Sequence, residues 1–345
     1  MTASPGVMAT GTILLAALID HLLGDPLSWP HPVVVMGWWI QRLRWLVERW
    51  SGDSPWKLRF GGVAITVLLV AGSGLIGWGL EQLALGHGGH TSPWLNTLAT
   101  ALMVVGLASA LAGRSLQQAV STVLDALLEG DRPLARQRLQ WIVGRDTADL
   151  DEAGILRATA ETAAENSVDG LFAPLFWMGV GVALWSVDSR WPGPLSLAWA
   201  FKAASTLDSM LGYRRERLRW LGTAGARLDD ALVWIPCRLV MVSLPLIARP
   251  WQQWGMLVRA AEKDGRQDPS PNAGRAEAIY AHCAGVRLGG LNRYGDRWIE
   301  KPVLAADKPS ADDQGVRRIL RLTRQLALTW LLIILVTAVA LNANQ

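Results

Sequence analysis

Long apolar runs, separated by basic segments, dominate the hydrophobic pattern of this chain. A transmembrane helix needs about 20 consecutive, mostly apolar residues. Five runs meet or approach that length, at residues 9–23, 60–80, 94–113, 171–187 and 326–341. The pattern therefore predicts an all-α fold, a polytopic membrane protein with about five transmembrane helices that forms a single integral membrane domain over residues 1–345.

Two further apolar stretches carry charged residues and are ambiguous as membrane spans. Residues 195–211 include Lys202 and Asp208, and residues 231–248 include Arg238 and two prolines. Ionisable side chains at membrane depth are costly unless they face protein or water, so they are candidates for function by default.

The distribution of Lys and Arg predicts the orientation of the runs, because cytoplasmic loops are enriched in these residues. Residues 41–59, 114–170 and 214–227 are basic, whereas residues 81–93 contain no Lys or Arg. The basic loops are expected inside and the N-terminus outside. Residues 249–324 are also basic, so residues 231–248 lie between two loops that are both expected inside, and they cannot make a single full crossing. The segment could form a re-entrant or interfacial hairpin broken at its prolines, or it could be covered by protein. The predicted cytoplasmic functional segments are residues 114–170, 202–230 and 262–309.

Composition supports a membrane protein and argues against other classes. The chain is 51% hydrophobic and only 18% charged, and it has 19 Trp, which favour membrane–water interfaces. The net charge of +4 comes from basic loops, and no nucleic-acid-binding motif occurs. We therefore expect the lipid bilayer as a partner and no nucleic acid. Two Cys without a CxxC motif imply neither a disulfide framework nor a zinc site.

The first candidate for chemistry is a carboxylate stripe in residues 144–170. Glu161, Glu165 and Asp169 recur at a spacing of four residues, which places them on one face of a predicted helix. Like charges at this spacing repel, so the stripe favours a cation such as Mg²⁺, held by one or two carboxylates plus phosphate oxygens. The alternative is a solvated helix with an Arg157–Glu161 pair.

The second candidate lies in residues 201–230. Lys202 and Asp208 stand inside an apolar segment, where pairing is expected, and the pair could serve catalysis or only stability. Asp229 and Asp230 could cap the next helix or bind metal. No GxxxxGK[ST] motif occurs in the chain, which makes a P-loop nucleotide fold unsupported.

The third candidate is a segment at residues 262–309, rich in Gly, Asn, Asp and Pro, with little periodicity, which predicts ordered functional loops. Its amides and cations suit a phosphate or polyamide ligand. The alternative is a turn-rich loop without a ligand. The residues that motivate the ligand are Asn272, Arg287, Asn292, Tyr294 and Lys301.

These stretches and several others occur as ordered motifs along almost the whole chain. They are DHLLGDP at 20–26, HPV at 31–33, VGRDT at 143–147, ETAAENSVDG at 161–170, TLDSMLGY at 206–213, ARLDD at 226–230, WIPCRL at 234–239, PSPNAG at 269–274, GVRLGG at 285–290 and EKP at 300–302. The ordered set resembles the adenosylcobinamide-phosphate synthase family of cobalamin biosynthesis (CobD/CbiB).

The resemblance implies a carbon–nitrogen ligase of the bacterial inner membrane, with ATP and Mg²⁺ as cofactors and the active site facing the cytoplasm. The implied substrates are adenosylcobyric acid and (R)-1-aminopropan-2-ol or its O-phosphate, which would give adenosylcobinamide or its phosphate. The implied metal ligands are Glu161, Glu165, Asp169 and Asp208. The implied catalytic residues are Glu165, Lys202, Asp208, Asp229 and Asp230. The implied substrate-binding residues are Asn166, Asn272, Arg287, Asn292, Tyr294 and Lys301.

The chain departs from the usual family pattern at a few positions, and two other readings stay open. The departures are Val233, Ser205, Ala276, Leu291 and Arg293. One alternative is a regulatory membrane protein of the related AmpE type without synthase activity, and another is a transporter. The glycines between residues 72 and 79 would allow close helix packing, within a chain or in a homo-oligomer.

Overall fold

The computed structural model describes residues 5–24, 31–87, 92–213, 215–295 and 297–343, and most of them are helical. Asp25 and Pro26, which end the first ordered motif, lie outside the described residues. The helices are α1 Pro5–Leu23, α2 Pro32–Ser51, α3 Pro55–Ala84, α4 Pro93–Ala108, α5 Gly113–Leu128, α6 Arg132–Gln140, α7 Glu152–Ser167, η1 Val168–Phe172, α8 Ala173–Val187, α9 Pro194–Leu211, α10 Leu218–Leu221, α11 Thr223–Ala248, η2 Trp251–Gln253, α12 Trp254–Gly265, α13 Ala273–Ala284 and α14 Asp313–Ala343. Strands β1 Leu288–Tyr294 and β2 Arg297–Leu304 form an antiparallel hairpin.

Six helical stretches in the described residues are long and apolar enough to cross a membrane, so the protein is a polytopic, all-α membrane protein. They are Pro5–Leu23, Pro55–Ala84, Pro93–Leu128, Glu152–Val187, Thr223–Ala248 and Asp313–Ala340. Five of them contain or overlap the five predicted spans, and the sixth was ambiguous in the sequence. Helix α9, the other ambiguous segment, is not among them.

Of the alternatives for residues 231–248, the hairpin is wrong, because α11 runs as one helix from Thr223 to Ala248 through Pro236 and Pro245. A proline inside a helix lacks the N–H that would bond the carbonyl four residues earlier. For Pro236 that carbonyl belongs to Leu232, and it accepts a hydrogen bond from Trp177 Nε1 at 3.2 Å. A neighbouring helix thus satisfies the carbonyl that the proline leaves open, which is how helices in apolar surroundings tolerate proline.

The chain divides into two compact units. Unit 1 comprises Met1–Ala112, Ala173–Leu232 and Trp330–Gln345, and unit 2 comprises Gly113–Phe172 and Val233–Thr329. Membrane-crossing helices occur in both, and each unit has its own buried core.

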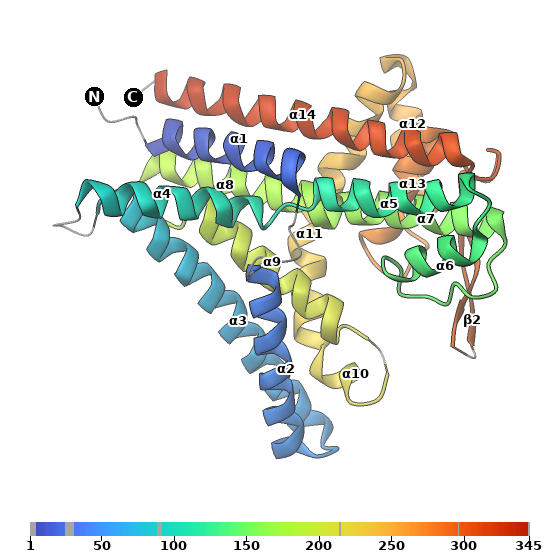
Figure 1. Cartoon of the computed structure of the whole chain (residues 1–345), viewed down its shortest axis with the longest axis horizontal. Helices are drawn as coiled ribbons and strands as arrows, with labels where there is room; N and C mark the ends of the chain where they lie inside the picture. The colour runs from blue at the N-terminus through green and yellow to red at the C-terminus, as the bar shows by residue number, and fades with distance from the viewer. Residues whose placement is uncertain (1–4, 25–30, 88–91, 214, 296, 344–345) are drawn as a thin grey trace. The chain divides into compact units, whose positions relative to one another are not determined.

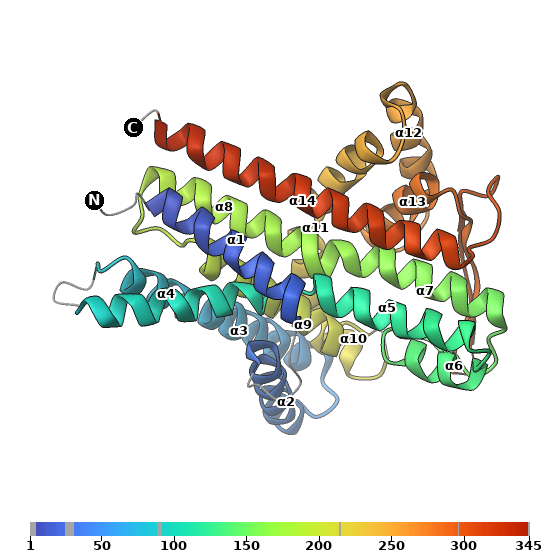
Figure 2. The same ribbon diagram turned by 45° about the horizontal axis from the view of Figure 1, so that its top comes forward.

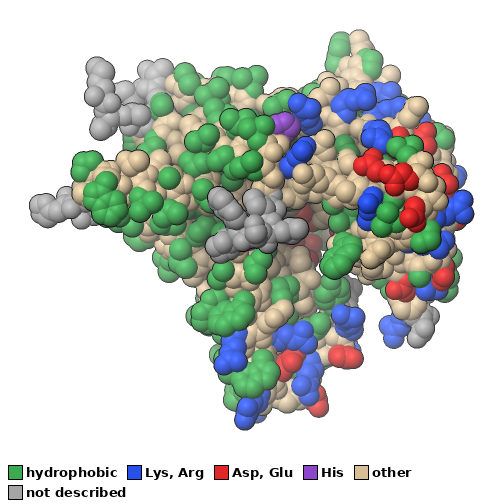
Figure 3. Space-filling model, in the orientation of Figure 1, with side chains coloured by type: hydrophobic (Ala, Val, Ile, Leu, Met, Phe, Trp, Pro, Cys, Tyr) green, Lys and Arg blue, Asp and Glu red, His purple; other side chains and the backbone are tan. Residues whose placement is uncertain are grey.

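In unit 1, α3 packs along α9, and α1 packs against α4 and α8 (Figures 1 and 2). Glycines of α3 permit the approach, since a Cβ at Gly77 would meet Ser196 Cα at 2.8 Å and one at Gly62 would meet Leu221 O at 2.0 Å. Packing of small residues within the chain is therefore confirmed at Gly77, whereas Gly72 and Gly79 face open space. Hydrophobic side chains lie exposed over α1 and α4, as lipid contact requires (Figure 3).

A buried carboxylate joins α3 to the start of α9 in unit 1. Glu81 has no exposed surface, and it accepts backbone N–H groups from Gly193 at 2.8 Å, Leu195 at 2.6 Å and Ser196 at 3.1 Å. The first N–H groups of a helix have no partner within the helix, and the helix dipole favours negative charge there. Glu81 therefore serves as a remote N-terminal cap for α9.

In unit 2, α5 and α6 pack on α7, while α12 and α13 pack on each other (Figure 2). The interpretation of residues 262–309 as loops is partly wrong, because they contain the Ala-rich helix α13 and the β1–β2 hairpin. Helix α13 is buried almost throughout, and Tyr280, which has no exposed surface, bonds Thr323 at 2.8 Å. With no polar face, this helix shows no amphipathic period in the sequence.

Candidate functional site

The residues of the first and third predicted stretches meet in unit 2, where α7 contacts α13 and β1. Glu161 of α7 accepts a hydrogen bond from Arg145 Nη2 at 2.6 Å and another from the backbone N–H of Gly289 at 2.8 Å. Both side chains of the ion pair are about nine-tenths buried, with 7% of Arg145 and 6% of Glu161 exposed. Glu161 thus links α7 to Arg145 and, through Gly289, to strand β1.

Gly289 holds a backbone conformation that only glycine adopts easily. Its φ is +82°, and a Cβ there would lie 1.9 Å from Pro302 O on the paired strand. The strand register is also irregular here, between Leu288 and Gly290. This bulge directs the Gly289 N–H to Glu161, which explains why the VRLGG motif needs its first glycine.

We expect Gly289→Ala to disrupt the hairpin, because the added methyl group meets a backbone oxygen and disfavours the positive φ. Gly295→Ala is a matched control, since Gly295 also has a positive φ, of +61°, but open space around its Cβ position. The control should lose about 1–2 kcal/mol of stability and Gly289→Ala several kcal/mol. Thermal unfolding of the purified variants in detergent measures both, and equal losses would contradict the argument.

Arg157, one turn before Glu161 on α7, holds β1 through its guanidinium group. It donates to Gly289 O at 3.0 Å, to Leu291 O at 2.8 Å and to Asn292 Oδ1 at 3.3 Å. Its Nε also lies 3.8 Å from Glu161, so the alternative Arg157–Glu161 pair exists within this larger network.

Asn292, predicted to orient an amide, is 2% exposed and carries an unused donor. Its Nδ2 has no hydrogen-bond acceptor among the described residues, while its Oδ1 is fixed by Arg157. A buried donor without a partner is rare and needs an explanation such as water or a ligand. The donor is enclosed by protein, so a buried water is its simplest acceptor, and a ligand carbonyl would replace that water only if the surrounding residues open.

Lys301 on β2 lies among carboxylates that come from other parts of unit 2. Its Nζ is 3.1 Å from Glu277 Oε1 and 3.7 Å from Asp268 Oδ2, and Glu277 is almost fully buried. Burial raises the pKa of Glu277 to about 8, against the opposing effect of the Lys301 ammonium. Burial also lowers the pKa of Lys301, but the carboxylates of Glu277, Glu165 and Asp268 outweigh it, so the pKa is raised and the ammonium keeps its proton.

Asn272 starts α13 and is held from two sides by α11. Its Oδ1 accepts from Arg238 Nη1 at 2.5 Å, and its backbone oxygen accepts from Cys237 Sγ at 3.4 Å. Arg238 also donates to Pro271 O at 2.8 Å. Arg238, whose charge made residues 231–248 ambiguous as a span, thus binds the PSPNAG motif. The sequence did not reveal this contact.

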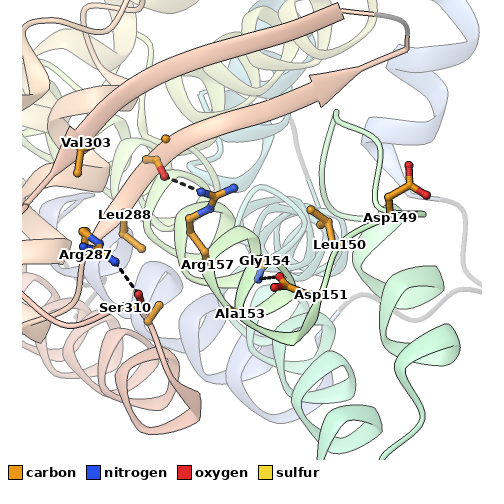
Figure 4. A pocket seen from close by; sticks show the side chains of 13 residues that line it. Asp149, Leu150, Asp151, Ala153, Gly154, Arg157, Arg287, Leu288, Val303 and Ser310 are labelled. Atoms are coloured by element: carbon orange, nitrogen blue, oxygen red, sulfur yellow. Dashed lines mark hydrogen bonds between the residues drawn. The ribbon is translucent and has the colours of Figure 1, made fainter.

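A pocket of about 580 Å³ opens beside this network (Figure 4). Arg157 and the predicted substrate-binding residue Arg287 line it with Gly289, Gly290 and the first turn of α7, and Arg287 donates to Ser310 Oγ at 2.9 Å. The two acidic residues that line the pocket already have partners: Asp151 accepts a hydrogen bond from Gly154 N, and Asp149 pairs with Arg293. Guanidinium groups beside a glycine-rich turn and a helix start suit a phosphate group.

Other predicted residues of unit 2 lie on the same elements. Asn166 is exposed and donates to Thr162 Oγ1 at 2.7 Å, and Glu165 is half-buried. Asp169 belongs to the π-helical turn η1, so the α-helical period behind the predicted stripe does not continue through it. Tyr294 ends β1 opposite Arg297.

The predicted residues of the second stretch lie in unit 1. Lys202 and Asp208 are half-buried on α9, and Asp229 and Asp230 are half-buried on the first turns of α11. Asp208 and Asp230 are near enough for their charges to repel. A pocket shared by these residues with Glu165 and Asn272, which belong to unit 2, stays a prediction.

The structure gives Glu161 protein donors where the sequence predicted a magnesium ion. Each of its two oxygens accepts a hydrogen bond, from Arg145 and from Gly289. Among the described residues, no group of three or more His, Cys, Asp or Glu side chains is placed to hold a metal ion. A site with one or two carboxylates stays a prediction.

Comparison with known proteins decides the family. The family model described as CobD/Cbib protein matches residues 13–323. The chain belongs to this family. It is 44% identical over 290 residues to the cobalamin biosynthesis protein CobD of Synechocystis sp., covering 84% of this chain and 80% of that protein. It is 38% identical over 331 residues to CobD of Yersinia enterocolitica, covering 96% of this chain and 98% of that protein.

Salmonella typhi has a further relative, the cobalamin biosynthesis protein CbiB, which is 36% identical over 310 residues and is matched over 91% of its length by 89% of this chain. No solved structure matches the chain. The CobD/CbiB resemblance of the ordered motifs is thus confirmed, and the names of the relatives support a role in cobalamin biosynthesis.

Proposed function

We propose that this CobD/CbiB family member is an ATP-dependent ligase of cobalamin biosynthesis. It would join adenosylcobyric acid to (R)-1-aminopropan-2-ol or its O-phosphate, in the bacterial inner membrane with its site facing the cytoplasm. The proposal rests on one observation above others. Motifs that lie more than 100 residues apart in the sequence meet in unit 2, where Glu161, Arg157 and Gly289 are bonded to one another beside a pocket.

The chemistry requires activation of the acid, because a carboxylate does not react with an amine at neutral pH. ATP as co-substrate would convert the carboxylate to an acyl phosphate, whose carbonyl the amine attacks to form the amide and release phosphate. Enzymes catalyse phosphoryl transfer mostly by positioning the groups and neutralising their charge.

The residues of unit 2 suit these two tasks. Arg287 and Arg157 would neutralise phosphate oxygens in the pocket, and the glycine-rich turn lets the backbone approach them. The unused Nδ2 donor of Asn292 would hold a carbonyl oxygen of the substrate, which carries many amide groups. Asp229 or Asp230 of unit 1 would take the proton from the ammonium of the amine.

Magnesium would bind by few protein ligands. Mg²⁺ usually keeps several waters and takes one or two carboxylates together with phosphate oxygens. Glu165 and Asp169, both half-buried in unit 2, are the proposed ligands there. Both oxygens of Glu161 accept hydrogen bonds, from Arg145 and Gly289, so Glu161 is not proposed as a ligand. Asp208 stays a proposed ligand, and the ion would supply charge neutralisation at the phosphates.

The direct test is a reaction with the purified full-length chain in lipid nanodiscs. Adenosylcobyric acid, Mg²⁺ and ATP are combined with the free amine in one arm and its O-phosphate in another, and products are identified by mass spectrometry. Formation of adenosylcobinamide or its phosphate that depends on ATP supports the proposal. Absence of both products in every arm, with protein that is folded, would contradict it.

We expect Arg287→Gln to lower kcat/KM about 10- to 100-fold, because a charged hydrogen bond to phosphate is lost from the pocket. Arg297→Gln is the matched control, since Arg297 is exposed on the neighbouring strand and does not line the pocket. Steady-state rates with varied ATP and varied amine show which substrate is affected. Equal effects of the two substitutions would remove Arg287 from the site.

A further inference from the structure

A surface of unit 1 combines basic and aromatic side chains. It is formed by α2, the start of α3 and the segment around α10, which are packed together. Figure 3 shows Lys and Arg side chains interleaved with hydrophobic ones in the lower part of the view, over these elements. Residues 32–59 and 213–220 hold nine Lys and Arg but only three Asp and Glu.

Most of the described basic residues of this surface stack on aromatic rings instead of pairing with carboxylates. Arg44 and Arg217 pair with Glu48 and Asp53, at 2.8 and 2.7 Å. The others lie 4.4–5.4 Å from a ring centroid: Arg42 and Arg49 on Trp45, Lys57 on Trp50, Arg59 and Arg219 on Trp220, and Arg215 on Tyr213. We call these six cations and four rings the basic–aromatic surface.

This arrangement presents charge to a partner. A guanidinium group stacked on a ring keeps its charge, and its N–H donors point outward in the plane of the group, where they can bond phosphate oxygens. The local excess of positive charge is not neutralised by carboxylates of the same surface among the described residues. An anionic partner is therefore the complementary one.

The rest of α2 indicates where that partner lies. Trp38, Trp39, Val34, Val35 and Leu46 of this helix are about half exposed or more. Its 20 residues nevertheless do not qualify as a membrane span, and they include four charged residues in the last ten. A helix with exposed Trp and aliphatic side chains beside Lys and Arg is typical of one that lies in the membrane–water interface.

We propose that the basic–aromatic surface binds the head groups of anionic phospholipids, with α2 lying in the interface. The exposed apolar side chains of α2 would enter the acyl boundary, while Arg42, Arg49, Arg59 and Arg219 bond lipid phosphates. The rings hold these cations in place before the lipid arrives. This proposal does not depend on the proposed ligase reaction.

The experiment measures lipid retention by the full-length chain. Protein purified in detergent is mixed with equal amounts of phosphatidylglycerol and phosphatidylcholine, and native mass spectrometry counts the bound lipids. We expect phosphatidylglycerol to be retained about tenfold more, and the variant with Arg42, Arg49, Arg59 and Arg219 all changed to Gln to lose most of this preference. The control changes four exposed Arg elsewhere, Arg259, Arg266, Arg321 and Arg324, and should keep it.

A salt titration of the unchanged protein keeps the test decisive if the fourfold variant fails to fold. The preference for phosphatidylglycerol should fall steeply between ~50 mM and ~500 mM salt, because exposed charges are screened. Three results would overturn the proposal: no preference, an equal loss in the control variant, or displacement of the lipid by inorganic phosphate at equal concentration. Burial of the surface between two copies of the chain, seen as a stable dimer without bound lipid, would also overturn it.

Discussion

Replacement of Lys301 by Met should destabilise the protein by about 3 kcal/mol near pH 9 and by clearly less near pH 6. The ammonium lies 3.1 Å from Glu277, whose side chain is 2% exposed, and its removal leaves a buried carboxylate without its cation. Burial already raises the pKa of Glu277 to about 8 in the intact protein, and loss of the ammonium raises it further.

The sign of the pH dependence follows from that raised pKa. An acid whose pKa is higher in the folded state binds its proton more tightly there, so the folded state is favoured at low pH. The unfolded Glu277 ionises near its ordinary pKa of 4.5, and the folded one near 8. Above about pH 5 the unfolded state releases this proton, so both proteins lose stability as the pH rises, but in the intact protein the fall ends near pH 8, where Glu277 ionises beside the ammonium. In Lys301→Met the folded carboxyl keeps its proton to higher pH, so the difference between the two proteins should widen above about pH 8.

Two further variants isolate the pair. Glu277→Gln combined with Lys301→Met removes both charges and should recover most of the loss, since no buried charge stays unpaired. Lys308→Met removes an ammonium whose partner Asp307 is 67% exposed, and should have little effect on stability at either pH. Thermal unfolding in detergent at both pH values measures all four proteins. A loss in Lys301→Met that is the same at both pH values would sink the buried-pair explanation.

The membrane-spanning part of the fold could be predicted from the sequence because its signal is local. Five long apolar runs predicted helices that the structure contains. The hairpin alternative at residues 231–248 followed from the basic loops on both sides and assumed a break at the prolines. Trp177, whose hydrogen bond satisfies the carbonyl that Pro236 leaves open, lies 55 residues from that carbonyl in sequence. The β1–β2 hairpin was missed for a similar reason, because its hydrogen bonds come from Arg157 of α7, more than 130 residues earlier in the sequence.

The candidate site shows the same division between local and distant information. The motifs identified residue types that suit phosphate and amide groups; Arg287 lines the pocket, and Asn292 accepts a hydrogen bond from Arg157, which also lines it. Their binding of substrate stays a prediction. The spacing of carboxylates on a helix could not reveal that Arg145 and Gly289 N donate hydrogen bonds to the two oxygens of Glu161. Nor could spacing show that Lys301 would lie among carboxylates from three separate segments, since nothing local in the sequence pairs Lys301 with Glu277.

Replacement of Glu81 by Ala should have the largest effect on unit 1. Three buried backbone N–H groups at the start of α9 would lose their acceptor, and each unsatisfied buried donor costs about 1–3 kcal/mol. We therefore expect a loss of at least about 3 kcal/mol, which is a large share of the stability of most domains. Helix α9 carries Lys202 and Asp208, so the proposed reaction should fail together with the fold.

Glu81→Gln separates the charge from the hydrogen bonds, because the amide keeps one acceptor oxygen and has no charge to interact with the helix dipole. Its stability should lie between those of the intact protein and Glu81→Ala. Asp53→Ala is the control in unit 1, since Asp53 is 86% exposed and its pair with Arg217 should contribute little to stability. The unfolding temperature in detergent, together with the fraction of monodisperse protein after purification, gives the ranking. If Glu81→Ala unfolds no earlier than Asp53→Ala, the buried carboxylate does not hold α9, and the acceptor for the start of that helix must be sought elsewhere.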